Sequence, residues 1–251
     1  MNRSSFIVKK LEAKTKRAIY DYSLIDQGDG VLVGLSGGKD SYALLDLLVN
    51  LNRSMPEKFR IEACHVVASD MPYKADIDFM KQYCSENSIP LYFESITIDY
   101  RPERRQPACF ICSWKRRKAL FKLARQRECS KIALGHHLND AVETLLMNIV
   151  HHSSISSMPP ILSMFDGELF VIRPLILAHD TELKKYCDHL GFPSERSLCP
   201  YDDKTSRESV RQMIDQLSKL NRSALENIFR SMGNICTDYI VSNPTNKKPP
   251  K

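Results

Sequence analysis

The chain has 251 residues, of which 43% are hydrophobic and 26% charged, a balance typical of globular proteins and not of collagen, low-complexity chains or coiled coils. No apolar run approaches the roughly 18 residues of a membrane span, and the N-terminus lacks a signal-peptide core, which predicts a cytoplasmic protein without membrane contact. The formal net charge is +6, but the stretch from Arg101 to Lys131 holds eleven Lys or Arg and two Asp or Glu. This stretch predicts a surface that binds a polyanion such as nucleic acid, the alternative being a solvated helix face.

Helical and strand patterns follow one another along the chain. A basic amphipathic helix is expected over residues 5–26 and ends before Gly28. Strands are then expected over 31–35, 61–67, 91–98, 131–135 and 169–172, with helices around 43–48, 74–87, 113–128 and 138–150. This alternation predicts an α/β fold, a parallel sheet flanked by helices, with ligands bound outside the carboxyl ends of the strands.

The composition suggests four parts. We expect a basic N-terminal helix over 1–29, an α/β domain over 30–178, a helical extension over 179–240 and a disordered tail over 241–251. The tail is rich in proline and lysine, which cannot bury enough apolar surface to fold.

A glycine loop, Ser36-Gly37-Gly38-Lys39-Asp40-Ser41, stands between the first predicted strand and its helix. Its backbone N–H groups, the helix N-terminus and the Lys39 ammonium suit an anionic phosphate group. The loop is not a Walker A motif, because Val33 and Asp40 stand where that motif needs Gly and Ser or Thr. Asp40 either helps to hold Mg²⁺ or caps the helix.

The eight cysteines fall into two groups. Cys109 and Cys112 form a CxxC motif, and Cys199 lies in a proline-flanked loop. Three thiolates suit a [4Fe–4S] cluster with one open iron, while zinc with a fourth His or Asp ligand remains an alternative. A thioredoxin-like redox pair fits less well, because it needs the motif on a helix N-terminus near the first strand. The other five are expected to be small core residues, namely Cys64, Cys84, Cys129, Cys187 and Cys236.

Several motifs together resemble, in order and spacing, the tRNA 2-thiocytidine synthetase family of the PP-loop ATP pyrophosphatase superfamily. They are SGGKDS (36–41), CFICSWKRR (109–117), ALGHHLNDAVETLLMN (133–148), MPP (158–160), VIRPL (171–175), GFP (191–193) and Cys199. The chain departs from the family at Asn139, where an aspartate is usual, so that any metal or ATP role there rests on Asp140.

The resemblance implies ATP-dependent conversion of cytidine to 2-thiocytidine in the tRNA anticodon loop, at position 32, through an adenylated intermediate and a cluster that carries sulfide. It implies ATP, Mg²⁺ and a [4Fe–4S] cluster as cofactors, and tRNA, a cysteine desulfurase and a second copy of the chain as partners. Lys39 and Asp40 would be catalytic. The residues implied to bind ATP are Ser36, Gly37, Gly38, Lys39, Asp40, Ser41, Gly135, His136 and Asp140, and those implied to bind the cluster are Cys109, Cys112 and Cys199.

Two alternatives to this function stay open at the level of sequence. One is another PP-loop tRNA-modifying enzyme, of the lysidine or thiouridine type. The other is a zinc-stabilised tRNA-binding module. For the function that the resemblance implies, we expect the basic stretch and the N-terminal helix, with Lys9, Lys10, Lys14, Lys16 and Arg17, to hold the tRNA backbone.

Overall fold

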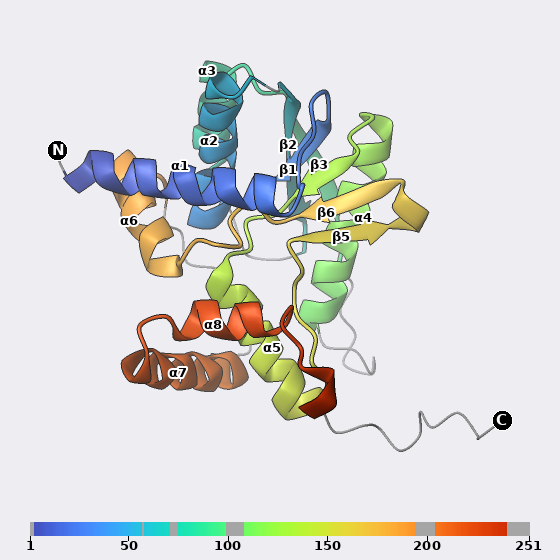
Figure 1. The fold of residues 1–251 in the computed structure, drawn as a ribbon. Helices are drawn as coiled ribbons and strands as arrows, with labels where there is room; N and C mark the ends of the chain where they lie inside the picture. Colours follow the sequence, from blue (N-terminus) through green and yellow to red (C-terminus); the bar gives the residue numbers. More distant parts are fainter. Residues whose placement is uncertain (1–2, 57, 71–74, 99–107, 194–203, 240–251) are drawn as a thin grey trace.

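A six-stranded sheet forms the centre of the computed structural model, which describes residues 3–56, 58–70, 75–98, 108–193 and 204–239 (Figure 1). The strand order is β3-β2-β1-β4-β6-β5. Neighbouring strands are parallel except for β5, which pairs antiparallel with β6. The bounds are β1 (Gly30–Gly34), β2 (Arg60–Ala68), β3 (Leu91–Ile96), β4 (Lys131–Ala133), β5 (Ile161–Met164) and β6 (Leu169–Ile172).

Helices follow most of the strands and continue after the sheet. They are α1 (Arg3–Asp21), α2 (Lys39–Ser54), α3 (Ile77–Glu86), α4 (Ala108–Gln126), α5 (Leu138–His152), α6 (Asp180–Leu190), α7 (Lys204–Leu220) and α8 (Ala224–Ser231). The predicted α/β class with helices at both ends is confirmed. None of the helices in the described ranges combines the length and hydrophobicity that crossing a bilayer requires.

Two expectations about the elements were wrong. The sheet is not wholly parallel, because the unpredicted strand β5 adds an antiparallel edge. In addition, α4 begins at Ala108 and not near residue 113, so the CxxC motif lies inside the helix and not in a loop before it.

The two faces of the sheet carry separate apolar cores, as its apolar central strands require. Val31 and Val33 of β1 pack into the larger core with helices that include α1, α2 and α6. Leu32, between them, packs on the other face against Leu120 and Leu123 of α4. Because side chains alternate across a strand, one short apolar run serves both cores and holds the carboxyl ends of the strands in place.

Four of the five cysteines expected in the core are buried, namely Cys64, Cys84, Cys129 and Cys187, but the prediction was wrong for Cys236, which is exposed. Burial raises the pKa of the Cys64 and Cys187 thiols to about 12. These buried thiols therefore stay protonated at neutral pH and are poor metal ligands.

Helix α6 is attached to α1 through one carboxylate. Glu182 accepts from Lys10 at 2.8 Å, from Lys14 at 2.7 Å and from the backbone N–H of His179 at 2.9 Å. Burial alone would raise the pKa of Glu182, but these donors outweigh it and lower the pKa to about 2. Two of the lysines expected to hold tRNA are thus committed to an internal ion pair, as Arg17 is to Asp21.

We predict that Glu182→Gln lowers the free energy of unfolding by on the order of 2–3 kcal/mol at pH 7. The folded-state pKa lies below the unfolded value of 4.5, so the stabilisation is present above pH 4.5 and is lost as the pH falls towards 2. Urea unfolding of both proteins between pH 7 and pH 3 measures this difference. Glu168→Gln, in an exposed pair with Arg125, is the control and should change little. A difference for Glu182→Gln that does not shrink on acidification would contradict the assignment.

Candidate active site

The glycine loop, residues 36–41, turns the chain from β1 into α2 at the carboxyl edge of the sheet. Gly37 has a φ of 93°, a left-handed conformation that favours glycine. The hydroxyls close the turn from inside, since the Ser41 hydroxyl donates to the Gly38 carbonyl at 2.7 Å and the Gly38 N–H donates to the Ser36 oxygen at 3.3 Å. The loop is therefore preorganised around the N-terminus of α2, where an anion is favoured.

Gly135, which follows β4, lets the neighbouring loop approach this helix end closely. A Cβ atom at Gly135 would lie 3.0 Å from the backbone carbonyl of Asp40 and 3.2 Å from the Ser41 nitrogen. Any larger residue would push the two loops apart. The structure thus brings Gly135 to the glycine loop, as the sequence predicted.

Lys39 lies between two carboxylates. Its ammonium is 2.6 Å from Asp40 Oδ1 and 2.7 Å from Asp180 Oδ1. Burial opposes the charge on Lys39, but the hydrogen bonds to Asp180 and Asp40 outweigh it and raise the pKa of the lysine. In the same way burial would raise the pKa of Asp180, but the hydrogen bond to Lys39 lowers it. Asp180 belongs to the site although the sequence did not indicate it.

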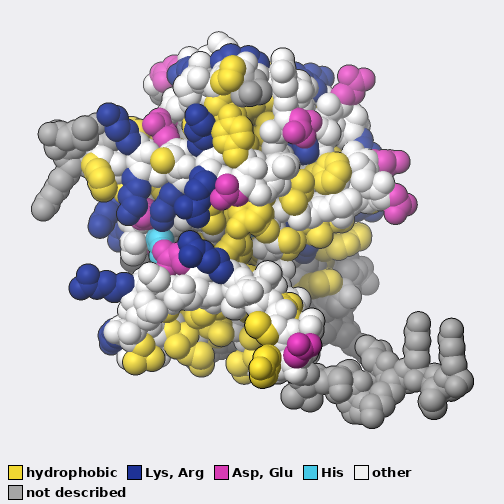
Figure 2. Space-filling view, in the orientation of Figure 1, with side chains coloured by type: hydrophobic (Ala, Val, Ile, Leu, Met, Phe, Trp, Pro, Cys, Tyr) yellow, Lys and Arg dark blue, Asp and Glu magenta, His cyan; other side chains and the backbone are white. Residues whose placement is uncertain are grey.

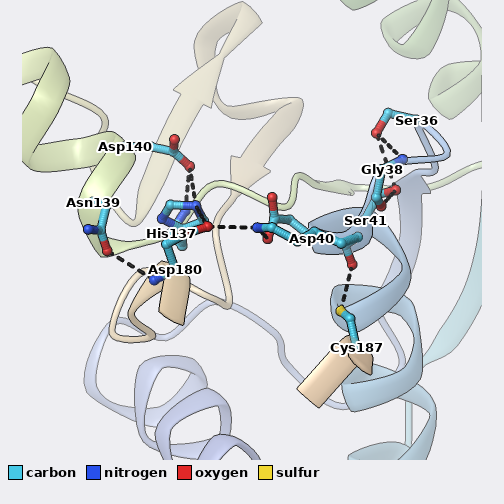
Figure 3. A network of polar contacts seen from close by, with 10 residues as sticks. Ser36, Gly38, Asp40, Ser41, His137, Asn139, Asp140, Asp180 and Cys187 are labelled. Atoms are coloured by element: carbon cyan, nitrogen blue, oxygen red, sulfur yellow. Dashed lines mark hydrogen bonds and ion pairs between the residues drawn. The ribbon is translucent and has the colours of Figure 1, made fainter. Parts of the chain in front are cut away.

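The start of α5 completes this arrangement (Figure 3). The His137 ring nitrogen Nε2 lies 3.5 Å from Asp140 and 3.6 Å from Asp180. Asp140 accepts from the His137 backbone N–H at 2.9 Å, and Asn139 accepts from the Asp180 backbone N–H at 3.0 Å. The residue that departs from the family pattern, Asn139, therefore orients the start of α6, a task that needs an acceptor oxygen but no charge.

Three side chains could share a metal ion. One ligand atom from each of Asp40, His137 and Asp180 lies within 4.8 Å of the other two. Carboxylate oxygens are the donors that Mg²⁺ prefers, so Asp40 and Asp180 suit it better than the imidazole does. Since Lys39 pairs with the same two carboxylates, a cation bound there competes with Lys39. Asp140, to which the sequence assigned any metal or ATP role in place of Asn139, uses one carboxylate oxygen to cap its own helix.

His136 is partly buried beside the glycine loop's neighbour Gly135. Its Nδ1 atom is buried and has no hydrogen-bond partner among the described residues. Burial lowers the pKa of His136 to about 4, so the imidazole is neutral at physiological pH. A neutral ring can donate one hydrogen bond and accept another, which suits a base or a phosphate oxygen.

Cys109 and Cys112 lie in the first two turns of α4, where Cys109 is exposed and Cys112 is partly buried. Ile111, between them, packs on Ala68 at the carboxyl end of β2 and on Ile98. The two thiols thus lie at the same sheet edge as the glycine loop. The sequence does not predict the two thiols on a helix N-terminus near the first strand, which disfavours a redox pair. They do lie on a helix N-terminus, but that helix follows β3 and not the first strand. The third predicted ligand, Cys199, lies outside the described residues.

Further along α4, basic residues project from the outer face. Arg117, Lys118 and Lys122 are exposed, while the Lys115 ammonium donates to the backbone carbonyl of Thr97. Trp114 is 51% exposed, and the Lys118 ammonium lies 5.3 Å from its ring centre. A second basic surface, over α1, is visible in Figure 2, but α1 also carries the lysines paired with Glu182.

Comparison with known proteins gives consistent results. A family model described as a PP-loop domain matches residues 7–217. The chain is 34% identical over 247 residues to a tRNA-cytidine(32) 2-sulfurtransferase of Vibrio campbellii, covering 93% of this chain and 80% of that protein. It is 35% identical over 248 residues to the protein of the same name from Dechloromonas aromatica, covering 93% and 82%.

A solved structure also matches over most of the chain. It is a U34-tRNA thiolase of Methanococcus maripaludis with its [4Fe-4S] cluster, with a TM-score of 0.76 and 22% identity over 95% of this chain and 81% of that one. At that identity the match establishes the fold.

We predict opposite effects of Lys39→Met on two ligands. Affinity for ATP should fall about tenfold or more, because a charged donor to phosphate is lost. Affinity for Mn²⁺ without nucleotide should rise, because the carboxylates of Asp40 and Asp180 are no longer paired with the ammonium. Calorimetry measures the first and electron paramagnetic resonance of Mn²⁺ the second.

Two variants of α6 control the metal measurement. Asp180→Asn should weaken Mn²⁺ binding, whereas Asp188→Asn, on the exposed face of the same helix, should not. If Lys39→Met leaves both affinities unchanged, the glycine loop is an ordinary turn and the carboxylates are only helix-capping groups.

Proposed function

The chain belongs to the tRNA-cytidine(32) 2-sulfurtransferase family of PP-loop proteins, and we propose that it thiolates cytidine 32 of tRNA at the expense of ATP. The observation that carries this proposal is the similarity over 93% of the chain, together with a preorganised anion loop at the edge where two thiols lie. The reaction is a group transfer that releases AMP and pyrophosphate.

The residues around the glycine loop would bind ATP and Mg²⁺. The loop N–H groups and the Lys39 ammonium would contact the phosphates, while Asp40 and Asp180 offer oxygens to Mg²⁺. Lys39 would leave the carboxylates for the phosphates as the metal arrives, so that the ammonium and the carboxylates each keep a partner of opposite charge. Gly135 and His136 would border the nucleotide from the β4 side, while Asp140 supports that side by capping α5.

The chemistry replaces one atom of the base. The O2 atom of cytidine attacks the α-phosphate, and the bond between the α- and β-phosphates breaks, so that pyrophosphate leaves. Sulfide then attacks C2, and the C2–O2 bond breaks with O2 departing in AMP. Adenylation is needed because an amide-like oxygen is a poor leaving group, and Lys39 would stabilise the charge on the departing pyrophosphate.

The thiols would hold the sulfur-carrying group. Cys109 and Cys112 are three residues apart in one helical turn, which places both side chains within reach of one cluster. We propose Cys199 as the third ligand. When bound, a [4Fe–4S] cluster with one open iron would supply the sulfide.

Partners and compartment complete the proposal. The exposed lysines and arginine of α4 would hold the tRNA backbone, and the sulfur donor would be a cysteine desulfurase. A second copy of the chain would cover exposed apolar residues near the end of α5, such as Ile149, Val150 and Ile155. We place the enzyme in the cytoplasm, where tRNA is available.

The direct test is thiolation in vitro by anaerobically prepared protein with ATP, Mg²⁺, tRNA and a sulfide source. Nucleoside mass analysis should show 2-thiocytidine, with AMP and pyrophosphate formed in equal amounts. Amidated cytidine would indicate lysidine-type chemistry. Stoichiometric zinc in place of iron, without product, would indicate a binding module.

We predict that Cys199→Ser, like Cys109→Ser and Cys112→Ser, yields folded protein that binds ATP but retains little iron and makes no 2-thiocytidine. Cys64→Ser, at a buried protonated thiol, should keep its iron. Since Cys236 is exposed, Cys236→Ser is the decisive control. Iron retained in Cys199→Ser and lost in Cys236→Ser would move the third ligand to the C-terminal end.

We predict that the affinity for tRNA falls steeply with salt and that α4 accounts for part of this dependence. The double variant Lys118→Gln with Lys122→Gln should weaken binding and reduce the slope of log K against log[salt] by roughly 0.7–0.9 for each lost phosphate contact. Lys58→Gln is the control, because its ammonium donates to the carbonyls of Asn52 and Arg53. An unchanged slope in the double variant would make the α4 face a solvated surface.

Trp114 gives an optical readout, because it is the only tryptophan in the chain. Phe110 and Trp114 are one turn apart on α4 and about half exposed, so a base of the anticodon loop should stack there and quench the fluorescence. Trp114 and Cys112 are about 160° apart around the helix, so this base is a neighbour of the target and not the target itself. Heparin, a polyanion without bases, should bind without comparable quenching, and equal quenching by both would exclude stacking.

A further inference from the structure

Arg173 is a buried cation for which the described residues provide no carboxylate. It directly follows β6, in the VIRPL motif, and is only 7% exposed. Its Nε atom is buried, and no described residue accepts a hydrogen bond from it. Within the described part of the chain no salt bridge involves Arg173, whereas the buried carboxylate Glu62 is paired with both Arg60 and Arg127.

The position of the guanidinium is fixed by another motif that the function above does not use. The Nη1 atom of Arg173 donates to the carbonyl of Pro159, and its backbone N–H donates to the carbonyl of Pro160 at 2.9 Å. The MPP segment thus holds one side of the guanidinium and leaves the Nε side directed elsewhere. Proline carbonyls are suited to this task because the ring restricts the backbone.

The groups around Arg173 are cationic or neutral. Burial, reinforced by the charge of Arg117, lowers the pKa of Arg173 to about 10, so the residue remains protonated at neutral pH. His136 lies near both arginines, and its Nδ1 atom is also buried without a hydrogen-bond partner in the described part of the chain. Asp140 is the acid that acts on His136, and it already accepts from the His137 N–H.

These groups converge at the edge where such sheets bind ligands. Ile172 of β6 pairs with Ala133 of β4, so Arg173 and His136 follow adjacent parallel strands at their carboxyl ends. A buried charge without a counterion is costly, and buried donors without acceptors add to that cost. An anion with several acceptor oxygens would satisfy both requirements.

We propose that Arg173, held by Pro159 and assisted by Arg117 and His136, binds a phosphate group of a substrate. The proposal rests on the proposed function in one respect, because that function supplies the two sources of the phosphate. These sources are ATP and the backbone of the target tRNA. A guanidinium presents a planar fork of donors to phosphate oxygens, which explains an arginine at this position and not a lysine. Arg117, on the outer side of α4, would connect this site to the basic face of that helix.

The test compares two ligands in the variants Arg173→Met and Arg173→Lys. The ligands are α,β-methylene-ATP with Mg²⁺ and a short RNA hairpin with the anticodon-loop sequence, each titrated by calorimetry. Arg173→Met should weaken at least one of them by about tenfold or more, and Arg173→Lys should weaken the same ligand by a smaller factor. Arg53→Met is the control, because it removes an exposed arginine at the other end of α2. Arg53 donates a hydrogen bond to Asn87, and its loss should change neither affinity.

The ligand that is weakened identifies the phosphate. A loss confined to the nucleotide analogue places an ATP phosphate at Arg173, and a loss confined to the hairpin places an RNA phosphate there. If both variants bind both ligands with wild-type affinity, the proposal is wrong. The proposal is equally wrong if both variants melt at lower temperature but keep wild-type affinities, since Arg173 would then be structural. Because these readouts measure binding, they stay valid if the wild-type protein makes no thiolated product, the result that would refute the proposed function alone.

Discussion

The ion pair between Lys39 and Asp180 joins the glycine loop to α6, and the rest of the site depends on where α6 lies. Three further contacts fix this helix along its length. Glu182 binds α1 through Lys10 and Lys14, the Tyr186 hydroxyl donates to Asp46 of α2, and the Cys187 thiol lies 3.3 Å from the Lys39 carbonyl. Since each contact is between segments remote in sequence, the site forms only when the whole fold has formed.

The two cations of the site are handled differently, and the difference matches their proposed tasks. Lys39 has carboxylate partners on both sides, so its charge is balanced until a metal and phosphates arrive. Arg173 has a carbonyl and no carboxylate among the described residues, so its charge stays available to an incoming anion. An exchangeable cation suits a group that must move during binding, while a fixed guanidinium suits one that positions a substrate.

Local patterns predicted most of the sheet and its helices, because the periodicity of a strand or a helix can be recognised over a short stretch of sequence. The hairpin of β5 and β6 was missed, although Asp166-Gly167, with φ values of 56° and 92°, is a dipeptide typical of such turns. The early start of α4 was missed because Ala108–Cys112 is apolar and short, although the preceding Pro107 is a residue favoured at helix starts. The first error is a missed short strand and the second a misplaced helix boundary, and in both the local signal is weak.

Asp180 could not be found in the same way, because its partner Lys39 is 141 residues distant and its own neighbours indicate only a first-turn acid. The cysteines also show that local sequence does not determine the surroundings of a side chain. Sequence placed Cys236 in the core with Cys187, yet only the fold makes one a protonated core thiol and leaves the other exposed. Residue type therefore indicates which chemistry a side chain can perform, while burial and long-range partners determine whether it performs it. In this protein the ionic contacts of α6 decide that question for the glycine loop, since they bring Asp180 within 2.7 Å of the ammonium of Lys39.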